Sequence, residues 1–276
     1  MAKKGVAMTT AYRPYFGFKS DPFSADLSTR DLLHLPGMLG VKQRLDYCLE
    51  LGGVMIVTGE VGSGKSTSLR WSASHFHPSE VLLATILGNS GSISEIYRLI
   101  CLALGLQPAS MSKAKLLTQA KTAIMDVVAS KKQKVVLIID EANLIRPEVF
   151  TELHTLTQFE HDSKNLVSVA LCGQTSLLDK LAYRGSAPLA SRVIAKSHLE
   201  TLSEPQLDEY ISHHLKIAGV SKRLFDTEAL RAIYQGSGGL LRKSNSLARG
   251  GLIAASIENK DFVNAEHIRI AASELF

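Results

Sequence analysis

The sequence has little cysteine, and its cysteines follow none of the spacings that bind metal ions or form a disulfide framework. Only three occur in 276 residues, at Cys48, Cys101 and Cys172, each in an apolar segment. Their wide separation favours buried, reduced thiols. The nine histidines also lack cysteine or carboxylate partners at ligand spacing, so we expect no metal site built from them.

Long hydrophobic runs are missing as well. No apolar run approaches the roughly 18 residues that cross a bilayer, and residues 1–10 lack the apolar stretch of a secretory signal. Hydrophobic residues make up 45% of the chain and charged residues 21%, as in a folded protein rather than a disordered one. We therefore expect a cytoplasmic protein that does not use a membrane as a partner.

The formal net charge of +5 is mild but unevenly distributed. Residues 113–134 carry six basic side chains against one acidic, and residues 216–249 carry seven against two. Such clusters are more often solvated faces than binding sites. They nevertheless permit a polyanionic partner, and nucleic acid is the obvious one.

Apolar segments alternate with helical patterns through the first two hundred residues. Strands are predicted at 53–59, 81–87, 135–140 and 166–173, and helices at 39–51, 65–76, 92–105, 112–130 and 147–159. This alternation indicates an α/β fold, a parallel sheet with helices on both faces. After residue 202 only helical patterns remain. We therefore predict an N-terminal arm packed on the core (1–38), an α/β core (39–201) and a small helical lid domain (202–276).

A glycine-rich loop follows the first predicted strand. Its sequence, GEVGSGKST, matches the phosphate-binding pattern G-x-x-x-x-G-K-[ST]. Glycines let backbone amides turn toward a phosphate at the start of the next helix. A chance glycine-rich turn is the alternative, but strand, loop and helix occur in the order that the motif requires. We predict that ATP and Mg²⁺ bind here, at Gly59, Glu60, Val61, Gly62, Ser63, Gly64, Lys65, Ser66 and Thr67, with Lys65 on the β- and γ-phosphates and Ser66 on the metal.

An acidic pair ends another apolar run, VVLIIDEAN. Asp140 is placed to hold magnesium, and Glu141 to orient or activate the attacking water. Alone, such a pair is more often a solvated strand end. Together with the phosphate loop, it predicts an ATPase that converts ATP and water to ADP and phosphate.

Three further positions extend this site. Gln174 ends the strand in VALCGQTSL, where a polar side chain can sense the γ-phosphate. Arg192, with Arg184 as the alternative, is a cation for a neighbouring subunit's nucleotide; a surface salt bridge is the competing interpretation. Arg242 begins a helix in the lid domain and can contact the nucleotide of its own chain.

In their order, the phosphate loop, LIIDEAN, LCGQ, SRV and GGLLR resemble an AAA+ ATPase of the initiator-like branch. More narrowly, YFGFKSDPFS and GGLLRKSNSLARGGLIAA resemble the ExeA/GspA type, which includes transposition-helper ATPases. The resemblance implies Gln174 as sensor 1, Arg192 as arginine finger and Arg242 as sensor 2, beside the catalytic Lys65 and Glu141. The family often has proline before the sensor-2 arginine, and this chain has Leu241.

The process served is open between three interpretations. We favour a helper of DNA transposition, similar to MuB, TnsC and IstB, which assembles with ATP into a ring or filament on duplex DNA and recruits a transposase. It would contact the DNA backbone without sequence preference. ExeA-type secretion ATPases carry a membrane helix beyond the ATPase region, and this sequence reaches Phe276 without one. A secretion ATPase lacking its membrane half and a non-hydrolysing adaptor are the alternatives.

Overall fold

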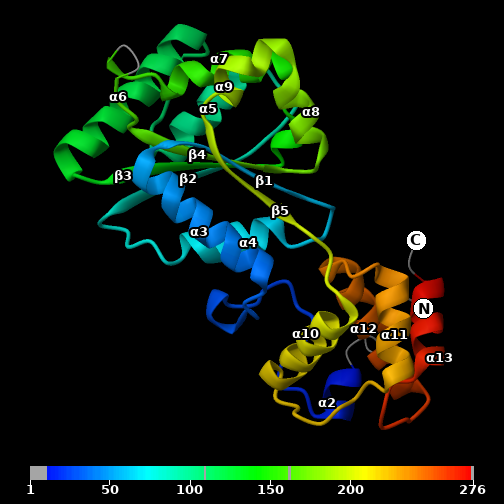
Figure 1. Ribbon diagram of the computed structural model, residues 1–276. Helices are drawn as coiled ribbons and strands as arrows, with labels where there is room; N and C mark the ends of the chain where they lie inside the picture. Colours follow the sequence, from blue (N-terminus) through cyan, green and yellow to red (C-terminus); the bar gives the residue numbers. More distant parts are fainter. Residues whose placement is uncertain (1–10, 109, 161–162, 275–276) are drawn as a thin grey trace. The chain divides into compact units, whose positions relative to one another are not determined.

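The computed structural model describes residues 11–108, 110–160 and 163–274, and these fall into two compact units. The α/β unit comprises residues 34–60 and 65–199. The helical unit comprises residues 61–64 together with the described residues of 1–33 and 200–276. Figure 1 shows the elements of each unit.

The α/β unit contains a five-stranded sheet in the order β2-β3-β4-β1-β5. The strands are β1 (Gly53–Gly59), β2 (Val81–Leu87), β3 (Lys134–Asp140), β4 (Val167–Gly173) and β5 (Val193–Leu199). Every neighbouring pair is parallel. The predicted parallel sheet is thus confirmed, and its central strands are the apolar runs read from the sequence.

Helices cover both faces of this sheet (Figure 1). On one face, α3 (Pro36–Leu51) and α4 (Lys65–Ala73) pack Leu45 and Leu69 against β1 and β3. The other face is covered by α5 (Ile93–Ala103), α6 (Lys113–Lys131), α7 (Pro147–Leu153), α8 (Ser176–Ala182) and α9 (Ala187–Ala190). There Ile100, Leu116 and Ile124 are buried.

Two expectations about these elements were wrong. The helix predicted over 147–159 ends at Leu153 and continues as a short 3₁₀ helix, His154–Thr157. The strand β5 was not predicted at all. It lies at the sheet edge, and its exposed residues Ile194, Lys196 and His198 alternate with less exposed ones, so it lacks the continuous apolar run of a central strand.

The helical unit is built from α10 (Glu204–Ile217), α11 (Thr227–Ser237), α12 (Leu241–Ile257) and α13 (Ala265–Ser273). Ser203 and Gln206 form a capping box at the start of α10, with Pro205 in the first turn. The side chain of Asp226 caps α11 by accepting from the Ala229 N–H at 2.7 Å. No helix in the part of the chain that the structure describes is long and apolar enough to cross a bilayer.

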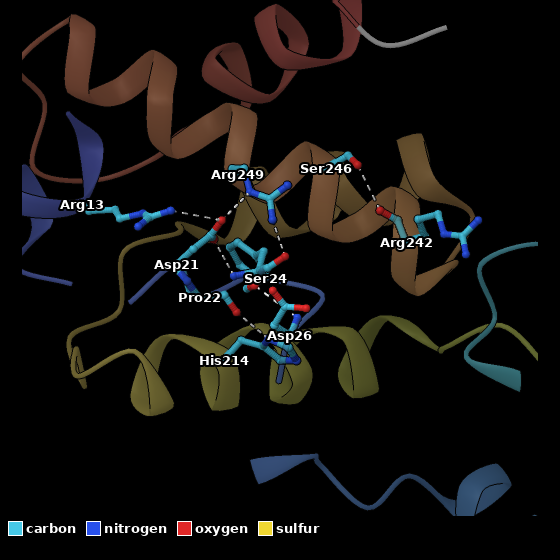
Figure 2. Close-up of polar contacts among 10 residues, drawn as sticks. Arg13, Asp21, Pro22, Ser24, Asp26, His214, Arg242, Ser246 and Arg249 are labelled. Carbon is cyan, nitrogen blue, oxygen red and sulfur yellow. Dashed lines mark hydrogen bonds and ion pairs between the residues drawn. The ribbon is translucent and has the colours of Figure 1, made fainter. Parts of the chain in front are cut away.

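The described part of the N-terminal arm groups with the helical unit, whereas the sequence analysis placed the arm on the core. It contains the short helix α2 (Tyr12–Phe16) and a 3₁₀ helix, Thr29–Asp31. Asp21 pairs with Arg249 of α12 at 3.1 Å, and His214 of α10 lies 2.6 Å from the Pro22 carbonyl oxygen (Figure 2). Phe23 is buried and stacks on His214. These contacts join the arm to α10 and α12 within the helical unit.

Candidate nucleotide site

The order of the strands brings the acidic pair, Gln174 and the end of β1 that precedes the phosphate loop to one edge of the sheet. In adjacent parallel strands, Leu87 pairs with Asp140, Ile139 with Leu171, and Thr58 with Gly173. The carboxyl ends of β3, β4 and β1 therefore lie side by side. Asp140 ends β3, Gln174 follows β4, and the phosphate loop follows β1. Ligands of open α/β sheets bind at this edge.

Lys65 begins α4 and is 7% exposed. Its Nζ donates to the carbonyl oxygens of Gly59 at 3.0 Å and Glu60 at 2.9 Å, so the loop's own backbone holds the ammonium group. Gly62 and Gly64 have φ angles of 86° and 93°, a region that side chains with a Cβ rarely adopt. The motif's glycines are thus required by the backbone conformation.

The residues present fit a nucleotide phosphate with magnesium. The Oγ atom of Ser63 is buried without a hydrogen-bond partner. Buried polar groups in folded proteins almost always have one, so this atom is available to a ligand. Ser66 is exposed at the start of α4, and Asp140 offers a carboxylate. Both supply the oxygen ligands that Mg²⁺ prefers, with water and phosphate completing the shell. Among the residues that the structure describes, no group of three His, Cys, Asp or Glu side chains forms a closed metal site.

The acidic pair stands on a constrained turn. The Oδ1 atom of Asp140 accepts from the Glu141 N–H at 2.9 Å, and Glu141 has a φ of 52°, uncommon for a residue other than glycine. Gly88, directly after β2, donates its N–H to the Asp140 carbonyl oxygen at 2.6 Å. A Cβ at Gly88 would lie 2.7 Å from the carbonyl oxygen of Glu141. Sequence reasoning missed Gly88, and the only signal was a glycine at a strand end.

Cys172 of β4 is fully buried beside the acidic pair. Burial raises the pKa of its thiol, the Asp140 carboxylate raises it further, and the Lys65 ammonium lowers it. All three cysteines are free and buried. The expectation of buried thiols outside any disulfide is therefore confirmed.

Gln174, predicted as the γ-phosphate sensor, is half-buried. Its backbone N–H donates to Oδ1 of Asn143 at 3.0 Å. Asn143 was also missed by the sequence reasoning, although it is the last letter of DEAN.

Of the predicted arginines, Arg192 is not brought to this edge of the sheet. Arg192 precedes β5, whose first residue pairs with Val54, so it lies at the amino end of the strands. Arg184 begins a 3₁₀ helix, Arg184–Ser186. Arg242 lies in α12 of the helical unit, where its backbone N–H donates to the Gly62 carbonyl oxygen at 3.2 Å. The roles of all three remain predictions.

The chain is similar to known proteins in sequence and in fold. Residues 49–181 match the family described as AAA domain. General secretion pathway protein A of Aeromonas hydrophila is 32% identical over 266 residues, which is 96% of this chain and 48% of the relative. The chain therefore spans about half the length of this curated relative.

Solved structures of similar fold include Cdc6p from Pyrobaculum aerophilum, with a TM-score of 0.75 at 17% identity, covering 94% of this chain and 72% of that one. The ORC1 protein of Aeropyrum pernix in complex with DNA gives a TM-score of 0.68 at 14% identity, covering 94% and 70%. Identities this low show the fold alone. Together, the comparisons show similarity to an AAA domain over residues 49–181 and, over most of the chain, the α/β fold with a helical C-terminal part that the Cdc6p and ORC1 structures share.

Proposed function

We propose that this chain binds ATP with Mg²⁺ and hydrolyses it to ADP and phosphate. The observation that carries the proposal is the convergence of the phosphate loop, the acidic pair and Gln174 at the carboxyl edge of three adjacent strands. Each part has a chemical role there: Lys65 binds the β- and γ-phosphates, Asp140 and Ser66 hold the metal, and Glu141 activates water. When bound, Mg²⁺ neutralises charge on the phosphates.

Two substitutions with matched controls test this proposal. Glu141→Gln keeps the shape of the side chain but removes its basicity, so it should bind ATP and hydrolyse it at least a hundredfold more slowly. Lys65→Ala should lose most nucleotide affinity. Glu148→Gln, an exposed glutamate in the first turn of α7, and Lys131→Ala, at the exposed end of α6, are the controls. Wild-type turnover by Glu141→Gln would remove the assignment.

We further propose that ATP drives self-association into a ring or filament, with Arg192 or Arg184 completing a neighbour's site and Arg242 contacting the nucleotide of its own chain. A trans-acting arginine stabilises charge on the transferring phosphoryl group. Sedimentation of the wild-type protein with ATPγS and with ADP tests the assembly. Equal sedimentation with both nucleotides would contradict it.

Two processes are candidates for the work that this ATPase does. The name of the curated relative, general secretion pathway protein A, favours a role in secretion. The basic clusters favour the second candidate, a cytoplasmic transposition helper that assembles on duplex DNA and recruits a transposase. ATP-dependent binding of random-sequence duplex DNA distinguishes the two. If the ATP-loaded protein ignores DNA even at low salt, the transposition role is excluded and the secretion role stands.

A further inference from the structure

A buried asparagine joins the two strand ends that carry the acidic pair and Gln174. Asn143 is 7% exposed and lies in the short 3₁₀ helix Ala142–Leu144, just after Glu141. Its Oδ1 atom accepts the backbone N–H of Gln174 at 3.0 Å, although the two residues are 31 positions apart in the chain. The hydrogen bond therefore fixes the end of β4 against the turn that follows β3.

The approach of these two segments is close enough to require glycine. A Cβ at Gly173 would lie 2.5 Å from Oδ1 of Asn143 and 2.9 Å from its backbone nitrogen. Both distances are shorter than any normal carbon contact. Gly173 thus allows the asparagine side chain to reach the Gln174 N–H directly.

Lys180 holds the same turn from a second side. Its Nζ atom donates to the carbonyl oxygens of Asn143 at 2.5 Å and Ile145 at 2.8 Å. Lys180 belongs to α8, the helix that starts just after Gln174, and hydrogen bonds from a charged donor are stronger than neutral ones. Three hydrogen bonds, one from Gln174 and two from Lys180, thus join the turn after the acidic pair to the segment from Gln174 to α8.

We propose that Asn143 is a positioning residue for hydrolysis. Through the Gln174 N–H it fixes the sensing glutamine relative to Asp140 and Glu141, so that contact of Gln174 with the γ-phosphate and the placement of the Glu141 carboxylate depend on each other. The inference rests on the proposed ATPase function. It adds a residue outside the nucleotide contacts, one that acts through another side chain.

A double-mutant cycle on ATP turnover tests the coupling. Asn143→Ala and Gln174→Ala should each slow turnover at least tenfold, and the double variant should be within about twofold of the slower single variant. Residues that act independently multiply their losses, so a multiplicative loss would overturn the proposal. Asn165→Ala is the matched control, because the side chain of this exposed asparagine also bonds a distant backbone group, donating to the Leu51 carbonyl oxygen at 3.4 Å.

Nucleotide affinity gives a readout that does not depend on turnover. Fluorescently labelled ATPγS and ADP should bind wild-type protein with different affinities. In Asn143→Ala the ratio of the two dissociation constants should fall at least threefold, while the affinity for ADP stays unchanged. An unchanged preference would contradict the proposal. If Asn143→Ala does not fold, Lys180→Met removes the hydrogen bonds to the same turn from α8. It should lower both ATP turnover and the preference between ATPγS and ADP. Wild-type values of both in Lys180→Met would then overturn the proposal.

The two proposals fail in different ways. Wild-type protein that neither binds nor hydrolyses ATP would remove the proposed function, and this inference with it. If the wild-type protein hydrolyses ATP and Asn143→Ala has the same turnover and nucleotide affinity as wild type, the inference alone is removed.

Discussion

The carbonyl oxygen of Arg192 accepts a hydrogen bond of 2.9 Å from the backbone N–H of Val54. This contact places Arg192 at the beginning of β1, whereas the phosphate loop starts at Gly59, at the other end of the strand. At about 3.3 Å per residue, the separation is about 20 Å, longer than an arginine side chain. Arg192 therefore cannot reach Gly59, where the phosphate loop of its own chain starts, and the proposed contact of Arg192 is with a neighbour's nucleotide.

Mixed oligomers test this consequence. Arg192→Ala subunits retain their own acidic pair, and Glu141→Gln subunits retain their arginine, so one intact composite site can form between them. We expect each variant alone to be at least tenfold slower than wild type, and mixtures to recover measurable turnover. Lys196→Ala, at an exposed position of β5, is the control. Failure at every mixing ratio, with both variants folded, would exclude Arg192 and leave Arg184.

Substitution of Gly88 should slow catalysis without weakening nucleotide binding. The added Cβ of Gly88→Ala would lie 2.7 Å from the Glu141 carbonyl oxygen and 3.1 Å from that of Asp140, so the acidic turn must shift. We expect kcat to fall at least tenfold, which corresponds to about 1.4 kcal/mol in the barrier, with a KM within about threefold of wild type. Steady-state kinetics measure both.

Gly40→Ala is the matched control for this substitution. Its Cβ would meet only the flexible Arg44 side chain, at 3.1 Å, and alanine is the better helix former. Equal kcat values for Gly88→Ala and wild type would show that the turn tolerates displacement.

Some lysines of the cluster 113–134 already have a partner within the chain, which reduces the number of candidates for the proposed DNA contact. In the cluster 113–134, Lys113 pairs with Glu152 at 2.6 Å, and Lys121 lies over the Phe159 ring. Within the described residues, Lys115, Lys131, Lys132 and Lys134 are exposed without an ion pair. These four, rather than the whole cluster, are the candidates for phosphate contacts.

If this surface contacts DNA, Lys131→Glu with Lys134→Glu should weaken ATP-dependent binding and flatten its salt dependence. Each lost phosphate contact reduces the slope of log K against log salt by about 0.9. Fluorescence anisotropy on random duplexes across a salt series measures this slope, with Lys260→Glu, an exposed lysine outside both clusters, as the control. A slope equal to that of wild type would exclude this surface as the DNA contact. Basal ATP turnover of the double variant should equal that of wild type.

The helical unit should lose stability as the pH falls below about 6.5. Burial lowers the pKa of His214, and the charge of His213 lowers it further, whereas the hydrogen bond to Pro22 raises it. Tyr210 and Phe23 pack on its ring. The unfolded chain binds a proton at His214 more readily than the folded one does. The contribution of the neutral imidazole to the free energy of unfolding is therefore fully present above pH 6.5. It is lost below that value by up to about 1.4 kcal/mol per pH unit.

Urea unfolding between pH 5 and 8, followed by a probe in the helical unit, measures this loss. His214→Asn keeps a donor in place of Nδ1 but does not titrate, so its unfolding free energy should change less over the same interval. His213→Gln, at the half-buried neighbour, removes only the smallest of these contributions, so it should retain most of the wild-type pH dependence. A wild-type profile in His214→Asn would assign the effect to another group.

The sequence by itself determined the central strands and the chemical parts that follow them. Apolar runs such as VVLIID can only be buried strands or helices, and their length and the glycines beside them decided for strands. The phosphate loop and the acidic pair were visible for a related reason. Each is a local pattern in which the backbone turn and the functional groups lie within nine consecutive residues.

Tertiary structure alone decided which distant residues support that site and where the chain ends pack. Gly88, Asn143 and Lys180 become important only because the order β2-β3-β4-β1 brings the segments after these strands together. Gly88 then bonds Asp140, Asn143 bonds Gln174, and Lys180 bonds the carbonyl oxygen of Asn143. Strand β5 lacked a sequence signal because its exposed positions include Lys196 and His198, whereas the other edge strand, β2, keeps the apolar run VLLATIL. The arm groups with the helical unit through the contacts of Arg249 with Asp21 and of His214 with the Pro22 carbonyl oxygen, and no local pattern records such a pairing.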